Sequence, residues 1–445
     1  MWLSRYKTTY LNILKLGLPL IVGQIGLIVT AFADTLMVGH YSTEALASAS
    51  FVNNLFNTPM MAIMGFTYGM TPLVGALFGQ GRSSDIGRLV KAGLVVTGVF
   101  ALIVTGLMWW IYDHLEMLDP PAELLPTIRP YYLLYLAGLV PVALCGVFLQ
   151  WSYAIRNTVL PTAVLLAANG LNIIGNYVLI FGHWGFDEMG LTGAGISTLV
   201  VRFLPLVAMA GVFFFKRSYT VYREGFTTNR MVSADVRRVT RTSWPVSLQL
   251  ALESGSFTLA AVMAGWIGKI PLASFQVIVV VGMLGFCIYY SIGNATSILV
   301  ANNAGLGDVK AMRRDAWGGY HIMLVFTAAA SLLFFFAGKE LMGLFTEDPE
   351  VLAASTALIF PLILYQMGDA TQITFSNALR GTSRVMPMLW IAFVAYVVIG
   401  VPAMYLLGIT ADMGVYGIIL SFSVSLFTAG GLFLYYFLDT LKHNS

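Results

Sequence analysis

Three acidic residues lie deep inside long apolar stretches of the sequence: Asp34, Glu253 and Asp369. A carboxylate is costly to bury in a bilayer, so an acid at such a position predicts a functional site. The apolar stretches offer no Lys to pair with these acids. A carboxyl group without a fixed partner can bind a proton, because burial disfavours its charged form, or it can hold a sodium ion with neighbouring oxygens. The three acids are therefore candidate cation-exchange sites.

Neutral oxygen-bearing side chains accompany these acids. Asn172 and Asn176 are spaced i, i+4, so both face the same side of a helix. Thr198 lies in the following apolar stretch, and Tyr365 precedes Asp369 by one helical turn. Amide and hydroxyl oxygens at these positions are candidate ligands for a cation beside a carboxylate.

Simpler interpretations stay open at this point. Intramembrane Asn side chains often only hydrogen-bond across helices. Asp34 precedes Gly39 and His40 closely, so it could be a solvated acid at the membrane surface. Arg202 is the one deeply placed base, and two roles suit it equally: it could line an interior cavity, or it could bond backbone carbonyls.

The elements that must position these residues are long apolar helices. A helix that crosses a bilayer needs about 20 mostly apolar residues, and we find twelve such stretches. Their expected limits are 14–38, 53–78, 89–112, 126–150, 160–182, 190–215, 243–267, 272–300, 316–338, 351–378, 386–408 and 414–438.

Composition supports a membrane protein over a soluble one. The 445 residues are 58% hydrophobic and only 10% charged, whereas globular chains are about 45–50% apolar and about 25% charged. The net charge of +3 is too small to suggest a nucleic-acid partner. Cys145 and Cys287 both lie in apolar runs, which argues against a disulfide scaffold or a zinc site. We expect an all-α polytopic membrane protein.

The distribution of basic residues predicts the topology. All but four of the 24 Lys and Arg fall in the tails and in the loops after even-numbered helices, or within three residues of them. Cytoplasmic loops carry the basic excess, so we expect both termini in the cytoplasm. The stretch from Lys216 to Arg241 is strongly basic and joins the sixth and seventh helices. We expect it to be a cytoplasmic linker, with anionic lipid contact as a secondary role.

The two halves of the sequence resemble each other at a nearly constant offset. Gly79 and Gly81 correspond to Gly305 and Gly307, and Ala154-Ile155-Arg156 corresponds to Ala378-Leu379-Arg380. We infer a duplicated six-helix unit: residues 1–215 form one lobe, 216–241 the linker, and 242–445 the other. Six is even, so both copies enter from the same side and their pseudo-two-fold axis follows the membrane normal. Such bundles, with a site at their interface, suit alternating access.

Other function classes lack their signatures. An intramembrane enzyme would need clustered His, Cys or paired catalytic acids, or a motif such as HExxH, and none occurs. There is no GxxxxGK[ST] motif for ATP either, so transport must draw on an ion gradient. A lipid-linked oligosaccharide flippase is the alternative kind of transporter. It would line its cavity with several Arg or Lys, whereas Arg202 is the single deep base here.

At this point the chain resembles the multidrug and toxic compound extrusion (MATE) family over essentially its whole length. No single motif is specific, but the set is, together with twelve helices and the duplication. The segments that carry the resemblance are Ala33-Asp34-Thr35, Met37-Val38-Gly39, Pro72-Leu73-Val74, Gly79-Gln80-Gly81, Asn172-Ile173-Ile174-Gly175-Asn176-Tyr177, Trp244-Pro245, Glu253-Ser254-Gly255, Asp369, Ala378-Leu379-Arg380-Gly381 and Pro387.

The resemblance implies a V-shaped pair of six-helix lobes that exports drugs or organic cations against inward flow of sodium or protons. It implies no other cofactor, no catalytic residue, a monomer among membrane lipids, and a bacterial inner-membrane location. By position it places an N-lobe cation site, and a C-lobe site that favours the NorM-like branch over the DinF-like one. The N-lobe residues are Asp34, Asn172, Asn176 and Thr198; the C-lobe residues are Glu253, Tyr365 and Asp369. Sodium could bind at Asp34, Asn172 and Asn176, or at the C-lobe set.

Overall fold

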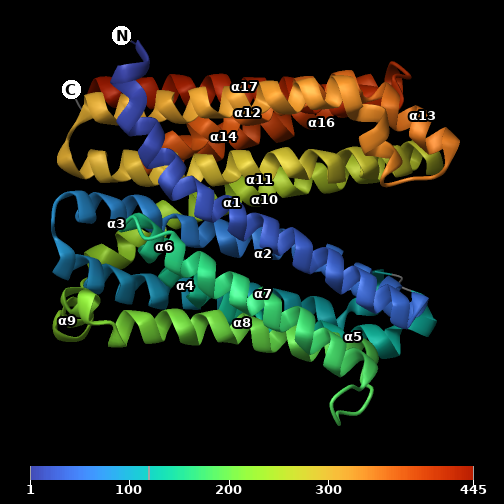
Figure 1. Ribbon diagram of the computed structural model, residues 1–445, viewed down its shortest axis with the longest axis horizontal. Helices are drawn as coiled ribbons and strands as arrows, with labels where there is room; N and C mark the ends of the chain where they lie inside the picture. The colour runs from blue at the N-terminus through green and yellow to red at the C-terminus, as the bar shows by residue number, and fades with distance from the viewer. Residues whose placement is uncertain (1, 119–120, 444–445) are drawn as a thin grey trace. The chain divides into compact units, whose positions relative to one another are not determined.

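The computed structural model describes residues 2–118 and 121–443, and side chains from Tyr6 onward. The described residues form helices joined by short connections, with no strand among them (Figure 1). The first half contains α1 (Trp2–Tyr41), α2 (Thr43–Tyr68), α3 (Met70–Gly79), α4 (Ser83–Asp113), η1 (Leu115–Leu118), η2 (Ala122–Leu124), α5 (Leu125–Ala137), α6 (Leu139–Ala154), α7 (Val159–Phe181), α8 (Gly190–Phe215), η3 (Arg217–Tyr219) and α9 (Thr220–Thr228). The second half contains α10 (Ser233–Ile267), α11 (Lys269–Leu306), α12 (Val309–Gly343), α13 (Pro349–Ala357), α14 (Ile359–Gly381), α15 (Met386–Ala392), the π-helix η4 (Phe393–Gly400), α16 (Val401–Tyr405), the π-helix η5 (Leu406–Thr410) and α17 (Gly414–His443).

The number of membrane-crossing helices agrees with the sequence prediction. In the described residues, 11 helices are long and apolar enough to cross a bilayer. The pair α13 and α14 passes the same test together, although it bends by 50° at its break. Counted as one span, this pair is the stretch expected at 351–378 and gives twelve. The prediction of an all-α polytopic membrane protein is confirmed.

The chain divides into two compact units. Unit 1 combines the chain up to Ile21 with the residues from Leu248 onward, and unit 2 runs from Val22 to Ser247. The division therefore falls inside α1 and inside α10, just after Pro19 and Pro245 respectively. Because proline removes a backbone hydrogen bond and kinks the helix at that point, one part of each helix can belong to unit 1 and the other part to unit 2.

The start of the chain differs from the expected lobe boundaries, because the first turns of α1 pack in unit 1. The Tyr10 hydroxyl lies 3.1 Å from Nδ1 of His321 on α12. A methyl group added at Gly17 would meet the Ile292 side chain of α11 at 2.8 Å. These contacts hold the beginning of α1 against α11 and α12.

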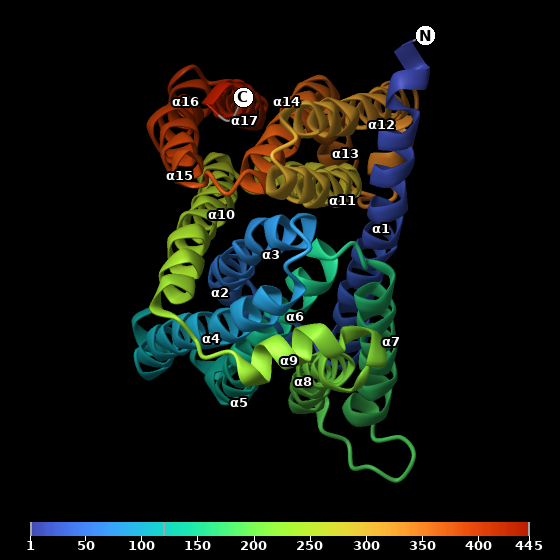
Figure 2. The same cartoon turned by 90° about the vertical axis from the view of Figure 1, so that its left-hand side faces the viewer.

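The basic segment between the halves is ordered onto unit 2. Its helix α9 lies against α4 (Figure 2). The two helices approach so closely at Gly87 and Gly225 that a methyl group at either position would overlap the backbone of the other helix. Asp235 at the start of α10 then pairs with Arg88 of α4 at 2.6 Å. The expected linker thus contains a helix, α9, that packs on α4, and an ion pair to α4 follows it at Asp235.

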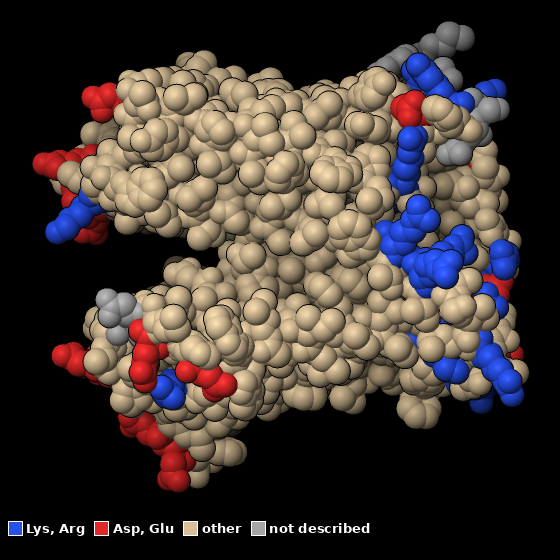
Figure 3. Space-filling model, turned by 180° about the vertical axis from the view of Figure 1, so that it is seen from behind, with Lys and Arg blue, Asp and Glu red and all other residues tan. Residues whose placement is uncertain are grey.

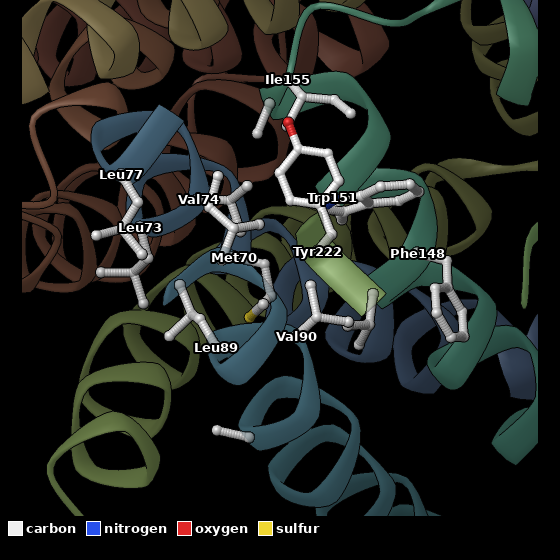
Figure 4. Packing of buried hydrophobic residues seen from close by; sticks show 14 of the residues in the cluster. Met70, Leu73, Val74, Leu77, Leu89, Val90, Phe148, Trp151, Ile155 and Tyr222 are labelled. Carbon is white, nitrogen blue, oxygen red and sulfur yellow. The ribbon is translucent and has the colours of Figure 1, made fainter. Parts of the chain in front are cut away.

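Unit 2 has a dense aromatic core at the end near α9. Met70, Val90, Phe148 and Trp151 from α3, α4 and α6 pack together with Tyr222 from α9 (Figure 4). The fully buried Trp151 makes an edge contact with the Tyr222 ring at 5.6 Å between centroids. Burial of side chains this large is worth about 1.5–3 kcal/mol each, so this core anchors α9.

In unit 1, α14 is the central helix and packs against α11, α12 and α17 (Figure 1). The close approach uses small residues, as is usual inside membranes. A methyl group at Gly293 of α11 would touch Asn377 of α14, and one at Gly430 of α17 would touch Thr371. This packing makes α14 almost inaccessible along the half that follows Asp369.

The charged residues visible on the surface of each unit lie at its two ends. On the face drawn in Figure 3, a broad uncharged belt separates an end rich in Lys and Arg from an end where Asp and Glu gather. Exposed large apolar side chains such as Leu102, Ile103 and Phe335 belong to the spans between these ends. A belt of this composition suits contact with lipid tails.

Candidate functional site

Asp34 of unit 2 is hydrogen-bonded to Asn176, one of the residues that the sequence analysis expected to lie near it. Asp34 lies on α1 about two turns before the helix ends, and its side chain is half-buried. The Nδ2 group of Asn176 on α7 donates to its Oδ1 atom at 2.5 Å. A carboxylate that accepts such a bond keeps its remaining lone pairs for a proton or a cation.

Asn172 lies one turn before Asn176 and joins α7 to α8. Its Nδ2 donates to Oγ of Ser197 at 3.3 Å, and Ser197 Oγ donates in turn to the Asn172 backbone carbonyl at 3.1 Å. Gly175 makes this possible, since a methyl group there would come within 2.5 Å of Ser197 Oγ. Ser197 is a site residue that sequence reasoning missed.

The side-chain carbonyl oxygens of both amides are without a hydrogen-bond partner. Asn172 and Asn176 are 3% and 0% exposed, and the Oδ1 atom of each is buried and unbonded. A buried acceptor without a partner is costly, by about 1–3 kcal/mol. Amide oxygens of this kind, one on the residue that bonds Asp34 and one a helical turn away, are chemically suited to bind a sodium ion.

Asp34 also faces a cavity of about 170 Å³ in unit 2. Thr198 of α8 lines the same cavity, as do Tyr131 and Tyr135 of α5. The remaining wall comes from α1 and α2: Ala31, Thr35, Val38, Leu46, Ala49, Ser50 and Asn53. The structure thus brings Asp34 and Thr198 to one cavity, with Asn176 bonded to the same carboxyl group. Sequence reasoning missed the two tyrosines, whose i, i+4 spacing in an apolar stretch was the available signal.

Arg202 lies on α8, one turn after Thr198, but it is not among the residues that line this cavity. Its guanidinium donates through Nη1 to the backbone carbonyl of Tyr135 at 2.9 Å. The same group lies 3.8 Å from the centre of the Tyr135 ring. Arg202 therefore contacts a wall residue of the cavity from outside the wall.

The acids of unit 1 form a second group. Asp369 on α14 is 3% exposed, and its Oδ2 atom is buried without a hydrogen bond. Glu253 on α10 is half-buried and lies within electrostatic range of Asp369 and Tyr365. Among the described residues, no Lys, Arg or His pairs with either acid. The predicted set Glu253, Tyr365 and Asp369 is brought together.

A further tyrosine belongs to this group and was missed. Tyr396 is 1% exposed and lies within electrostatic range of Glu253 and Asp369. It sits in the π-helix η4, a local widening of the helix that is frequent at functional sites. No periodicity in the sequence marks such a widening, which explains why it was not predicted.

Two buried glutamines, one in each unit, differ in their side-chain hydrogen bonds. Gln150 of α6 accepts a hydrogen bond from the Thr71 hydroxyl at 2.6 Å, which joins α6 to α3. Gln372 of α14 is 1% exposed and leaves its Oε1 atom unbonded. The first is a helix-joining contact.

The fold and the buried acids together define a class: an integral membrane transporter rather than an enzyme. Comparison with known proteins agrees. The family model MatE matches residues 19–178 and 245–406. The chain belongs to the MatE family, as the resemblance in its sequence had indicated.

Curated relatives carry the name "Probable multidrug resistance protein NorM". The relative from Xanthomonas campestris is 28% identical over 396 residues, which is 87% of this chain and 84% of that protein. The relative from Xanthomonas axonopodis is 27% identical over 404 residues, or 90% and 86% of the two chains. The prediction that the chain belongs to a family of multidrug membrane transporters is confirmed.

Solved structures share the fold. A variant of the Vibrio cholerae MATE transporter VcmN superposes with a TM-score of 0.90 at 15% identity, over 99% of this chain and 98% of the other. The eukaryotic MATE transporter AtDTX14 superposes with a TM-score of 0.89 at 19% identity, over the same shares. The expected MATE-type fold is confirmed.

Proposed function

We propose that this transporter exports drugs or organic cations by antiport with a monovalent cation, either sodium or the proton. The observation that carries the proposal is that each unit holds a buried or half-buried carboxyl group inside a span, with no basic partner among the described residues. In a bilayer such a group is stable only when it binds a proton or a cation. The names of the NorM relatives support drugs as the cargo.

In unit 2 the exchange would take place at Asp34. Asn176 orients the carboxyl group, and the free oxygens of Asn172 and Asn176 are suited to complete a sodium shell. One carboxylate with neutral oxygens cancels a single charge and leaves no net charge in the bilayer. A proton needs the carboxylate alone. The cavity at Asp34 and Thr198 gives either ion, or a cationic drug, a place beside the carboxylate.

In unit 1 the exchange would use the acidic pair. Two carboxylates in electrostatic range of each other, one buried and one half-buried, are unstable when both are charged without a cation, because like charges repel strongly where solvent is largely excluded. Glu253 and Asp369 therefore bind at least one cation or proton between them, and their titrations are coupled. Tyr365 and Tyr396 supply hydroxyl groups around the pair.

The flippase alternative gains no support. A site for a lipid pyrophosphate needs several cationic side chains, yet the cavity of unit 2 is lined by no Lys or Arg. Arg202 instead bonds a backbone carbonyl. Among the two roles left open for this residue, we propose the second.

We further propose that the chain lies in a bacterial inner membrane with both termini in the cytoplasm. The clustering of Lys and Arg at one end of each unit supports this orientation. A cysteine introduced at Arg230 should react with a membrane-impermeant maleimide only after permeabilisation of cells. A cysteine at Asp348 should react in intact cells; Cys145 and Cys287 are buried and supply a low background. Labelling of both positions from one side would refute the topology.

Efflux from intact cells tests the function. Cells that lack their own pumps and express this chain should expel ethidium against its gradient after de-energised loading. Expulsion should stop when an ionophore collapses the coupling gradient and should continue when ATP synthase is inhibited while the gradient is kept. Two results would reject the antiport proposal. One is expulsion that depends on ATP and is unaffected by sodium and proton ionophores, and the other is no expulsion at normal expression.

A further inference from the structure

Arg202 is held in one place by three features of unit 2. Its side chain occupies a hollow at Gly138, where a methyl group would collide with it. Its guanidinium bonds the Tyr135 carbonyl at 2.9 Å and lies against the Tyr135 ring at 3.8 Å. A planar guanidinium can satisfy a carbonyl and stack on a ring at once, which a lysine ammonium cannot.

The position of this bond follows from a helix break. Helix α5 ends at Ala137 and α6 begins at Leu139, and at this break the Tyr135 carbonyl accepts from the Gly138 N–H at 3.2 Å and keeps its second lone pair for Arg202. A positive charge at a helix C-terminus is also favourable for the helix dipole. Arg202 therefore lies where a cation is stabilised in the bilayer without a carboxylate partner.

The same arginine acts on the Asp34 cavity through the tyrosines of α5. Tyr135 lines the cavity together with Asp34. Tyr131, one turn earlier, is tilted against Tyr135 at 5.7 Å between centroids. Tyr131 lies within Coulombic range of both Asp34 and Arg202. The described residues contain no Arg202–Asp34 ion pair; Arg202 instead lies against the Tyr135 side chain, which lines the cavity that Asp34 faces.

We propose that Arg202 is a fixed positive charge that weakens cation binding at Asp34 and so permits release of the coupling ion. This inference rests on the proposed function, since it names the residue that sets the ion affinity of that site. A positive charge within Coulombic range raises the free energy of a cation bound at the carboxylate and lowers that of the empty carboxylate. Arg202 is a positioning and tuning residue, because it touches the cavity wall and not the ion.

Few other charges can contribute to this tuning. The titratable groups facing Asp34 are Tyr131 and Tyr135 on α5, and Arg202 behind them on α8. Helix α2 presents neutral Ser50 and Asn53 to the cavity, and α7 presents the neutral amide of Asn176 to the carboxyl group. Among the described residues that line the cavity or contact its lining, Arg202 is thus the permanent positive charge.

The test is ion binding to purified protein, in a background where Glu253→Gln and Asp369→Asn remove the unit 1 site. We expect Arg202→Gln to bind radioactive sodium about tenfold more tightly, or to raise the pH at half-maximal proton uptake by about one unit. Arg202→Lys keeps the charge and should restore near wild-type affinity even if thermal stability falls. The inference would be overturned if adding Arg202→Gln to the Glu253→Gln and Asp369→Asn background left the ion affinity unchanged.

A second variant keeps the test decisive if Arg202→Gln does not fold. Gly138→Ala leaves the arginine in the chain but displaces its side chain, and it should shift the affinity in the same direction by a smaller factor. An unchanged affinity in a folded Gly138→Ala protein would count against the inference. Asp34→Asn separates the two proposals: if it binds ions as well as its background does, the coupling site itself is misplaced.

Discussion

The carboxyl group of Asp34 and the pair Glu253 and Asp369 meet the same physical problem with different neighbours. Asp34 receives a hydrogen bond from the Asn176 amide, whose own oxygen has no hydrogen-bond partner among the described residues, and it faces a cavity. Glu253 and Asp369 lie near each other among tyrosines, and the Oδ2 atom of Asp369 has no hydrogen bond.

This difference indicates different ion preferences for the two groups. Neutral amide oxygens around one carboxylate make a site that sodium can use as fully as a proton can. Two carboxyl groups in Coulombic range lower their energy most simply by taking up a proton, since only one of them then stays charged. The side chains around the acids thus distinguish the two units.

The largest expected effect is in unit 1. We expect Asp369→Asn to abolish uphill drug efflux with the protein still folded and inserted, because an amide keeps the shape but cannot exchange charge. Glu253→Gln should have the same effect. Drug resistance of cells and ethidium efflux measure the outcome, with exposed Asp348→Asn as the matched control.

Normal resistance in cells that express either unit 1 variant at wild-type level would remove these acids from the mechanism. It would also break the comparison, since Asp34 alone would then couple transport.

Asp34→Asn should reduce gradient-driven efflux nearly as strongly, whichever ion is coupled. The reason is the same loss of exchangeable charge, but the half-buried position leaves some compensation by solvent. Efflux rates in inverted vesicles under an imposed gradient give the measurement. Near-normal rates would mean that Asp34 is a solvated residue and that the asparagines only join helices.

Asn176→Ala sharpens the comparison by separating the two ions. If sodium binds at Asp34, the loss of one ligand should lower the sodium affinity of transport about tenfold, and excess sodium should partly restore transport. If only protons bind, the variant should shift the pH profile and show no sodium response. Asn169→Ala, on the same helix but not bonded to Asp34, serves as the control.

Sequence reasoning found what depends on polarity along one helix. The spans follow from apolar length, and Asp34, Glu253 and Asp369 stand out because charges are rare inside spans. Thr198 and Asn176 were placed with Asp34 by position, and the structure brings them to that carboxyl group or its cavity.

What the sequence did not predict depends on contacts between helices. The bond of Arg202 to Tyr135 requires the break at Gly138 and the crossing of α8 over it, and neither has a local pattern. Tyr396 requires the π-helix of η4. The packing of the first turns of α1 in unit 1 follows from contacts with α11 and α12, far away in sequence.

Ion flux driven by drug in proteoliposomes tests the central claim most directly. Purified protein is reconstituted with sodium and pH gradients imposed separately, and ion movement is recorded when ethidium is added to one side. We expect drug addition to drive counterflow of sodium, protons or both in the wild-type protein, and none in the triple variant Asp34→Asn, Glu253→Gln and Asp369→Asn. Drug movement without counterflow of either ion, or equal counterflow in the triple variant, would contradict coupling through these carboxyl groups.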